Sequence, residues 1–221
     1  MSAPRTKKKV GQLALVAAGP GDPELLTLRA VSLLQLADTV VVDADALAIM
    51  GDHVPSETTV TVAVDADGVP LDPAGRAKLA IEAFRAGHRV VRLMAGDPFL
   101  DGTAALESAA LRRARVPFEV APGVSTLTGT AAYAGFGLTE KNAGQVHVVT
   151  DTEATIDWSS LASDGVTVVF PDAADRAGDI AQQLIEAGRK ASTPVVITRG
   201  GTTVEQRSIR STLADLPAAI K

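Results

Sequence analysis

Short apolar segments alternate along this sequence with amphipathic stretches, and turns rich in glycine and proline separate them. A short apolar run between turn residues indicates a buried strand, and the 3.6-residue period of the stretch that follows indicates a helix packed on a sheet. Strands that alternate with helices form an α/β fold, in which ligands bind beyond the carboxyl ends of the strands. We therefore predict an α/β fold and expect the functional residues where strands end.

The pattern also divides the chain. The predicted strands cover residues 13–18, 39–42, 60–64, 89–94, 117–121, 146–150, 166–170, 194–198 and 208–212. The predicted helices cover residues 23–37, 72–86, 103–115, 123–134 and 176–187. Because Pro122-Gly123 interrupts the alternation near its middle, we predict an N-terminal α/β domain at 13–121 and a C-terminal one at 122–221. Residues 1–12 are basic and lack apolar periodicity, which predicts a disordered tail.

The composition excludes several kinds of protein. None of the 221 residues is cysteine, which excludes a disulfide framework, a thiolate zinc site and a cysteine nucleophile. The formal net charge is −5, so we do not expect the basic face that nucleic-acid binding requires. No apolar run approaches the ~18 residues of a membrane-spanning helix. His53, His88 and His147 lack metal-ligand spacing, so we expect no bound metal.

Two turns of the same chemistry follow predicted strands. Gly19-Pro20-Gly21-Asp22-Pro23 comes after residues 13–18, and Ala95-Gly96-Asp97-Pro98 comes after residues 89–94. Glycine lets the backbone approach a ligand closely, and the Asp-Pro pair is typical of a helix N-terminus. The two turns could meet at one binding site. Alternatively, each is only a tight turn that caps a helix.

Charged residues near strand and helix ends are the other candidates. Asp43 ends the strand at 39–42, where a carboxylate can act as a general base or hold a ligand hydroxyl. A solvated loop acid is the alternative interpretation. Arg112, Arg113 and Arg115 lie late in a predicted helix and could bind carboxylates, although a solvated face is the favoured interpretation.

Several motifs occur in one fixed order along the chain. They are Gly19–Ala30, Ala37–Asp43, Val90–Phe99, Val120–Ser125, Ala132–Gly135 and Gly201–Thr203. Taken together they resemble the motifs of the tetrapyrrole methylase family, and most closely those of the uroporphyrinogen-III C-methyltransferases. The resemblance runs in register from about Leu13 to Leu213.

This resemblance implies the tetrapyrrole methylase fold, in which a cleft lies between two α/β domains. It implies a cytoplasmic homodimer that uses S-adenosylmethionine to methylate uroporphyrinogen III at C-2 and C-7, which gives precorrin-2 for sirohaem and cobalamin biosynthesis. By position, the cofactor-binding residues would be Pro20, Ala95, Gly96, Asp97, Leu100, Ser125, Thr126, Asp172 and Gly201. Asp43 corresponds to the proton acceptor, and Arg92 and Tyr133 would bind the substrate. Because the substrate is a polycarboxylate, arginines should line the open side of its site.

Departures from the family pattern favour a second interpretation. Met94 stands where the family usually has lysine, Asp172 stands where it has methionine, and residues 62–65 lack the lysine proposed as proton donor. The alternative is a catalytically degenerate binding or scaffold module of a fused uroporphyrinogen-III synthase. In either case we expect a longer polypeptide in which a synthase domain follows, and a second domain without its last strand.

Overall fold

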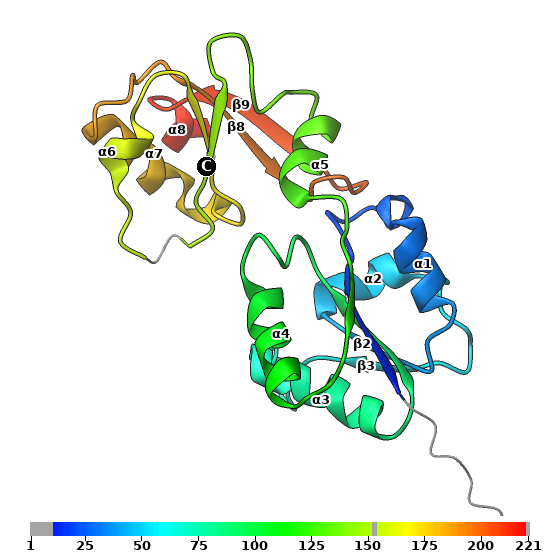
Figure 1. Ribbon diagram of the computed structural model, residues 1–221. Helices are drawn as coiled ribbons and strands as arrows, with labels where there is room; N and C mark the ends of the chain where they lie inside the picture. The colour runs from blue at the N-terminus through cyan, green and yellow to red at the C-terminus, as the bar shows by residue number, and fades with distance from the viewer. Residues whose placement is uncertain (1–10, 152–153, 220–221) are drawn as a thin grey trace, which may run out of the picture. The chain divides into compact units, whose positions relative to one another are not determined.

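The computed structural model describes residues 11–151 and 154–219. Residues 1–10 of the tail predicted at 1–12 therefore lie outside the described residues. The chain divides into two compact units, Met1–Ser125 and Thr126–Lys221, a few residues beyond the boundary predicted at Pro122. Each unit contains both strands and helices (Figure 1).

The first unit is built on a five-stranded sheet with the strand order β3-β2-β4-β1-β5. The strands are β1 (Gln12–Ala17), β2 (Thr39–Val42), β3 (Thr59–Val62), β4 (Arg89–Met94) and β5 (Glu119–Ala121). All neighbouring strands are parallel, so their carboxyl ends lie at the same edge of the sheet. The strands predicted at 39–42 and 89–94 are confirmed with the same bounds.

Four helices connect these strands. They are α1 (Leu28–Leu34), α2 (Leu47–Met50), α3 (Pro73–Arg85) and α4 (Thr103–Arg113), and the short 3-10 helices η1 (Pro23–Leu25) and η2 (Ala44–Ala46) precede α1 and α2. The single helix predicted over 23–37 is wrong. The Asp22 side chain caps η1, and Thr27 then takes an extended backbone and caps α1 by accepting from Ala30 N. Two caps in succession break the helix in two.

Helices cover both faces of the sheet, as Figure 1 shows for α1 and α2 on one side and α3 and α4 on the other. Ala30 and Leu34 of α1 pack with Val16 and Val40 in one buried cluster. The other cluster joins Ala80 of α3 and Leu111 of α4 to side chains that alternate along the strands, among them Leu13, Leu15, Val41 and Met94. A sheet covered on both faces explains why its central strands β1, β2 and β4 are apolar and buried at most positions.

The second unit contains two separate strand pairs among its described residues. β6 (Gln145–Val148) pairs in parallel with β7 (Val166–Val169), and β8 (Pro194–Arg199) pairs antiparallel with β9 (Arg207–Thr212). Its helices are α5 (Thr126–Tyr133), α6 (Trp158–Leu161), α7 (Ala177–Glu186) and α8 (Leu216–Ala219), with the 3-10 helix η3 (Ala174–Arg176) before α7. Ile180 and Leu184 of α7 form its core with Leu213 and Leu216. The sequence pattern missed the single-turn helices α6 and α8.

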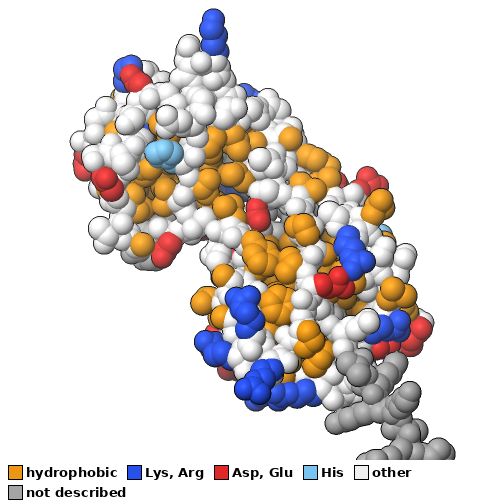
Figure 2. Space-filling view, in the orientation of Figure 1, with side chains coloured by type: hydrophobic (Ala, Val, Ile, Leu, Met, Phe, Trp, Pro, Cys, Tyr) orange, Lys and Arg blue, Asp and Glu red, His pale blue; other side chains and the backbone are white. Residues whose placement is uncertain are grey.

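The predicted arginine cluster lies on the surface of the first unit. Arg112, Arg113 and Arg115 are exposed, and the Arg112 guanidinium lies over the Phe118 ring, 6.0 Å from its centroid. Figure 2 shows lysine and arginine side chains gathered on this part of the molecule. The solvated face is therefore the interpretation that the structure supports. In the described part of the chain, no helix has the length and apolar character needed to cross a membrane.

Candidate active site

The two turns that contain Gly-Asp-Pro meet at the carboxyl edge of the first unit's sheet. β1 and β4 are neighbouring strands, and Gly19 and Gly96, which follow them, form an isolated antiparallel bridge. Their φ angles are +83° and +64°, a region that residues with a side chain rarely adopt. The turns therefore form a backbone cradle without side chains at these two positions, as expected if they serve one site.

The segment after β5 returns to the same edge. Gly123 lies so close to β1 that an added Cβ would be 2.9 Å from the Ala17 carbonyl oxygen, which leaves no room for a larger residue. This approach allows the Ser125 hydroxyl to donate to Asp97 Oδ2 over 2.5 Å. The predicted cofactor residues Asp97 and Ser125 are thus direct neighbours.

The remaining predicted cofactor residues of the first unit lie around this pair. Pro20 follows Gly19 in the first turn, and Ala95 follows β4 directly. Leu100 lies in the turn after Asp97, and 38% of the residue is exposed. The structure therefore brings the predicted residues of this unit to one edge of the sheet.

Asp43 lies at this edge, directly after β2. Its Oδ1 accepts a hydrogen bond from Arg92 Nη2 over 2.5 Å, and its Oδ2 accepts from the Ala95 backbone N–H over 3.0 Å. The side chain is 16% exposed, so the carboxylate is fixed but still reaches the surface. Asp43 is therefore not the solvated loop acid of the alternative interpretation.

Arg92, which was predicted to bind the substrate, is instead buried inside the first unit with 0% of its side chain exposed. Its Nε and Nη2 donate to the two carboxylate oxygens of Glu107 over 2.9 Å each. Its Nη1 donates to the Leu93 carbonyl over 2.7 Å. All three nitrogens are thus engaged by the protein, and this placement favours a role in holding Asp43 over direct contact with substrate.

Two charged residues near Asp43 were missed by the sequence interpretation. Glu107 lies on α4, and burial raises its pKa above the ordinary value, while the hydrogen bonds and charge of Arg92 lower it. Arg76 lies on α3, with its Nε 3.9 Å from Asp43 Oδ1. The spacing of Glu107 along the predicted helix could have indicated that it is buried, because it shares a buried face of α4 with Ala104 and Leu111.

The second unit holds the other predicted residues. Thr126 begins α5, and its Oγ1 is buried without a hydrogen-bond partner in the described part of the chain. Asp172 has a φ of +53°, in the left-handed region. Tyr133 ends α5 and is 50% exposed. Gly201 lies in the loop between β8 and β9, packed against Thr130 of α5.

Gly201→Ala should lower the free energy of unfolding of the second unit by about 1–3 kcal/mol, the usual cost of overpacking. The added Cβ would lie 2.6 Å from Thr130 Cγ2. Thr130→Ala removes that atom, so the double variant should recover much of the loss. Urea unfolding followed by the fluorescence of Trp158 measures both. Gly144→Ala is the matched control, because nothing lies within 4 Å of a Cβ there; equal effects at 144 and 201 would contradict this account.

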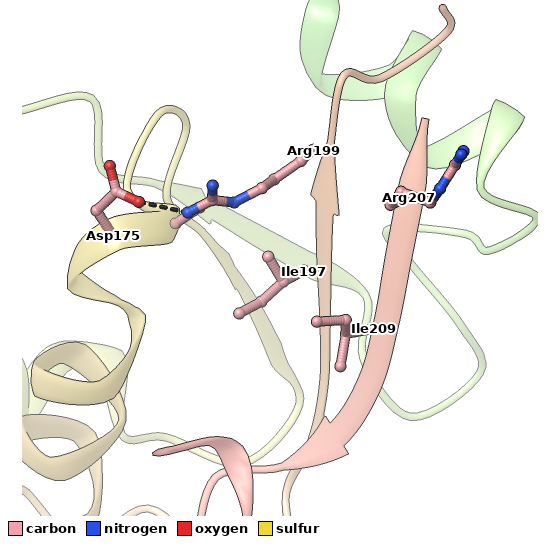
Figure 3. A pocket seen from close by; sticks show the side chains of 6 residues that line it. Asp175, Ile197, Arg199, Arg207 and Ile209 are labelled. Atoms are coloured by element: carbon pink, nitrogen blue, oxygen red, sulfur yellow. Dashed lines mark hydrogen bonds and ion pairs between the residues drawn. The ribbon is translucent and has the colours of Figure 1, made fainter. Parts of the chain in front are cut away.

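A hollow of about 370 Å³ lies on the second unit and contains none of the predicted residues. Ile197 and Ile209, which are cross-strand partners on β8 and β9, line it (Figure 3). Arg199 and Arg207 are also cross-strand partners, and Arg199 forms an ion pair with Asp175. The hollow is thus an apolar surface with an arginine on each strand.

In residues 11–151 and 154–219, no group of three or more His, Cys, Asp or Glu side chains is placed to hold a metal ion.

Comparison with known proteins identifies the family. A family model described as Tetrapyrrole (Corrin/Porphyrin) Methylases matches residues 12–217. This chain belongs to the tetrapyrrole methylase family. The resemblance carried by the ordered motifs is thereby confirmed.

The curated relatives of this tetrapyrrole methylase include siroheme synthases. The chain is 38% identical over 220 residues to siroheme synthase 2 of Aeromonas hydrophila, covering 96% of this chain and 46% of the relative. It is 39% identical over 218 residues to the siroheme synthase of Pseudomonas fluorescens, covering 95% of this chain and 47% of the relative. The chain thus spans about half the length of the curated relatives it matches.

Solved structures of the family resemble the chain as well. The uroporphyrin-III C-methyl transferase of Thermus thermophilus, complexed with S-adenosylhomocysteine, is 30% identical with a TM-score of 0.77, covering 95% of this chain and 92% of that one. A cobalt precorrin-4 methyltransferase is 25% identical with a TM-score of 0.82, covering 95% and 88%. The predicted α/β tetrapyrrole methylase fold is confirmed.

Tetrapyrrole methylases use S-adenosylmethionine, and the residues present in each unit of this chain fit that group. In the first unit, Gly19 and Gly96 leave a cradle of bare backbone beside the Asp97 carboxylate, which can accept from a hydroxyl or an ammonium group. In the second unit, the orphaned Thr126 hydroxyl is a buried polar group that a ligand could satisfy.

Proposed function

We propose that this chain is an S-adenosylmethionine-dependent methyltransferase that acts on uroporphyrinogen III at C-2 and C-7 and gives precorrin-2. The observation that carries the proposal is Asp43, a fixed and accessible carboxylate at the carboxyl edge of a tetrapyrrole methylase sheet. The siroheme synthase relatives and the uroporphyrin-III C-methyl transferase structure support this substrate. The further activities of full-length siroheme synthases are not part of the proposal.

The residues that would hold S-adenosylmethionine are those that the family resemblance implies by position. They are Pro20, Ala95, Gly96, Asp97, Leu100 and Ser125 in the first unit, and Thr126, Asp172 and Gly201 in the second. When bound, S-adenosylmethionine supplies a methyl group on a positively charged sulfur, and its transfer to carbon leaves a neutral thioether. The pyrrole carbon forms the new bond to the methyl group, so the protein must align that carbon and accept the proton that the substrate then loses.

Asp43 is the group that we propose accepts this proton. Its carboxylate is held by Arg92 and by the Ala95 backbone N–H, so it needs no rearrangement to face a substrate. A base in a fixed position can take the proton as the ring gains positive charge. Arg92 acts as a positioning residue, because its own nitrogens are engaged by Glu107, Asp43 and Leu93. Tyr133, half exposed at the end of α5, remains a candidate for substrate contact.

The second candidate function is a degenerate binding or scaffold module of a uroporphyrinogen-III synthase. Asp65 lies in the region where the family has its lysine. Its Oδ1 accepts hydrogen bonds from the backbone N–H groups of Asp67 and Val69, so Asp65 closes a turn. Asp172 replaces a methionine in the family's cofactor site and has a left-handed backbone. In either case we propose that the protein is a cytoplasmic homodimer.

Methyl transfer separates the two candidates. The protein is incubated anaerobically with uroporphyrinogen III and methyl-labelled S-adenosylmethionine, and calorimetry measures the binding of S-adenosylhomocysteine. The enzyme should bind S-adenosylhomocysteine and transfer two labelled methyl groups to each tetrapyrrole. Label no higher than in a heat-inactivated control would overturn the proposal, and failure to bind the cofactor product would favour the degenerate module.

A further inference from the structure

We propose that Arg76 binds a carboxylate of the substrate beside Asp43. This inference rests on the proposed function and names the arginine that meets the polycarboxylate. Arg76 lies in the first turns of α3, whose N-terminus is capped by the Asp72 side chain through Gly75 N at 2.7 Å. The helix is therefore fixed at the end where Arg76 projects.

The geometry of Arg76 leaves its outer nitrogens available. Its Nε donates to the Leu71 carbonyl over 2.6 Å and lies 3.9 Å from Asp43 Oδ1. Its Nη1 and Nη2 have no hydrogen-bond partner within the part of the chain that the structure describes. The side chain is 18% exposed, so these two groups present their N–H donors at an accessible place.

Arg92 and Arg76 both approach the Asp43 carboxylate, but in different ways. Arg92 is fully buried, and its guanidinium holds Glu107 and Asp43 from the interior. Arg76 approaches Asp43 Oδ1 at ion-pair distance without a hydrogen bond. Asp43 already accepts from Arg92 and from Ala95 N, so it does not take up the hydrogen-bonding capacity of Arg76.

The chemistry of the free groups identifies the class of ligand. A guanidinium presents a planar pair of N–H donors that matches the two oxygens of a carboxylate. Uroporphyrinogen carries carboxylate side chains on each pyrrole ring, so a ring whose carboxylate is bound by Arg76 would lie next to Asp43. Arg76 also places a positive charge beside Asp43, although an arginine does not act as a proton donor at neutral pH.

The test uses uroporphyrin III, the stable oxidised form of the substrate. Its affinity is measured by fluorescence titration of the wild-type chain and of Arg76→Gln and Arg76→Lys. We expect Arg76→Gln to weaken binding by about tenfold or more, because a charge-assisted hydrogen bond is lost. Arg76→Lys should bind with an intermediate affinity, weaker than wild type and stronger than Arg76→Gln, because it keeps the charge but not the planar pair of donors. S-adenosylhomocysteine should bind all three with the same affinity. Raising the salt concentration should weaken wild-type binding more than that of Arg76→Gln.

Arg85→Gln is the matched control, because Arg85 is an exposed arginine on the same helix and should have no effect. Thermal unfolding verifies that each variant is folded. If Arg76→Gln does not fold, the affinity of Arg76→Lys provides the test. Equal affinities of wild type and Arg76→Gln, or no uroporphyrin binding by wild type, would overturn the inference. Arg76-dependent binding without any methyl transfer would support the inference and overturn the proposed function, so the two failures are distinct.

Discussion

Glu107→Ala is expected to lower the free energy of unfolding of the first unit by about 3–5 kcal/mol, the usual cost of breaking a buried ion pair from one side. The change leaves Arg92 fully buried with its Nε–H unsatisfied, and of the two carboxylates that it binds only Asp43 remains. Urea unfolding followed by far-UV circular dichroism measures the loss. The single tryptophan, Trp158, lies in the second unit, so its fluorescence follows the unfolding of that unit separately.

Two variants show whether the loss comes from the buried guanidinium that has lost Glu107. Arg92→Met combined with Glu107→Leu removes both charges and keeps similar volumes, so it should be much more stable than Glu107→Ala. Glu82→Ala removes an exposed glutamate on α3 and should change the stability by less than about 0.5 kcal/mol. A Glu107→Ala variant no less stable than Glu82→Ala would show that the buried pair is not what holds α4 to β4.

This buried pair links the fold to the candidate chemistry. Arg92 lies on β4 and Glu107 on α4, and their contact fixes the guanidinium that in turn fixes Asp43. The double variant should therefore recover stability but not activity, because it removes the Arg92 hydrogen bond that holds Oδ1 of Asp43. That difference separates positioning from a purely structural role.

The sequence predicted the first unit well where the signal was local. β2 and β4 have the predicted bounds because most of their residues are apolar or β-branched and all but Arg89 are buried. The position of Asp43 followed from the end of β2, and the meeting of the two glycine turns followed from their place after strands. The helix at 23–37 failed because Thr27 can cap a new helix as well as continue an old one.

The contacts among distant residues were beyond a local pattern. Arg92 was assigned to the substrate by resemblance alone, and only the packing of α4 on β4 shows that Glu107 engages it. Arg76 reaches Asp43 because α3 packs against the same sheet, and no spacing within the sequence encodes that approach. In the second unit the strands were found, but their pairing in two separate pairs depends on tertiary structure.

Asp43→Asn is expected to slow methyl transfer by about 10²–10⁴-fold, the contribution of a positioned general base. Asparagine has nearly the same shape and keeps an oxygen that can accept from Arg92 or from Ala95 N, so the fold should persist. It lacks the charge and basicity needed to accept the proton that the substrate loses. Binding of S-adenosylhomocysteine should change little, because the predicted cofactor residues do not include Asp43.

Single-turnover transfer of labelled methyl to uroporphyrinogen III, with both ligands saturating, tests the central role of Asp43 most directly. Wild type, Asp43→Asn and Asp45→Asn are compared; Asp45 is an exposed carboxylate two positions away and serves as the matched control. The account predicts rapid transfer by wild type and Asp45→Asn, and transfer at least about 100-fold slower by Asp43→Asn. Equal single-turnover rates for wild type and Asp43→Asn would contradict it.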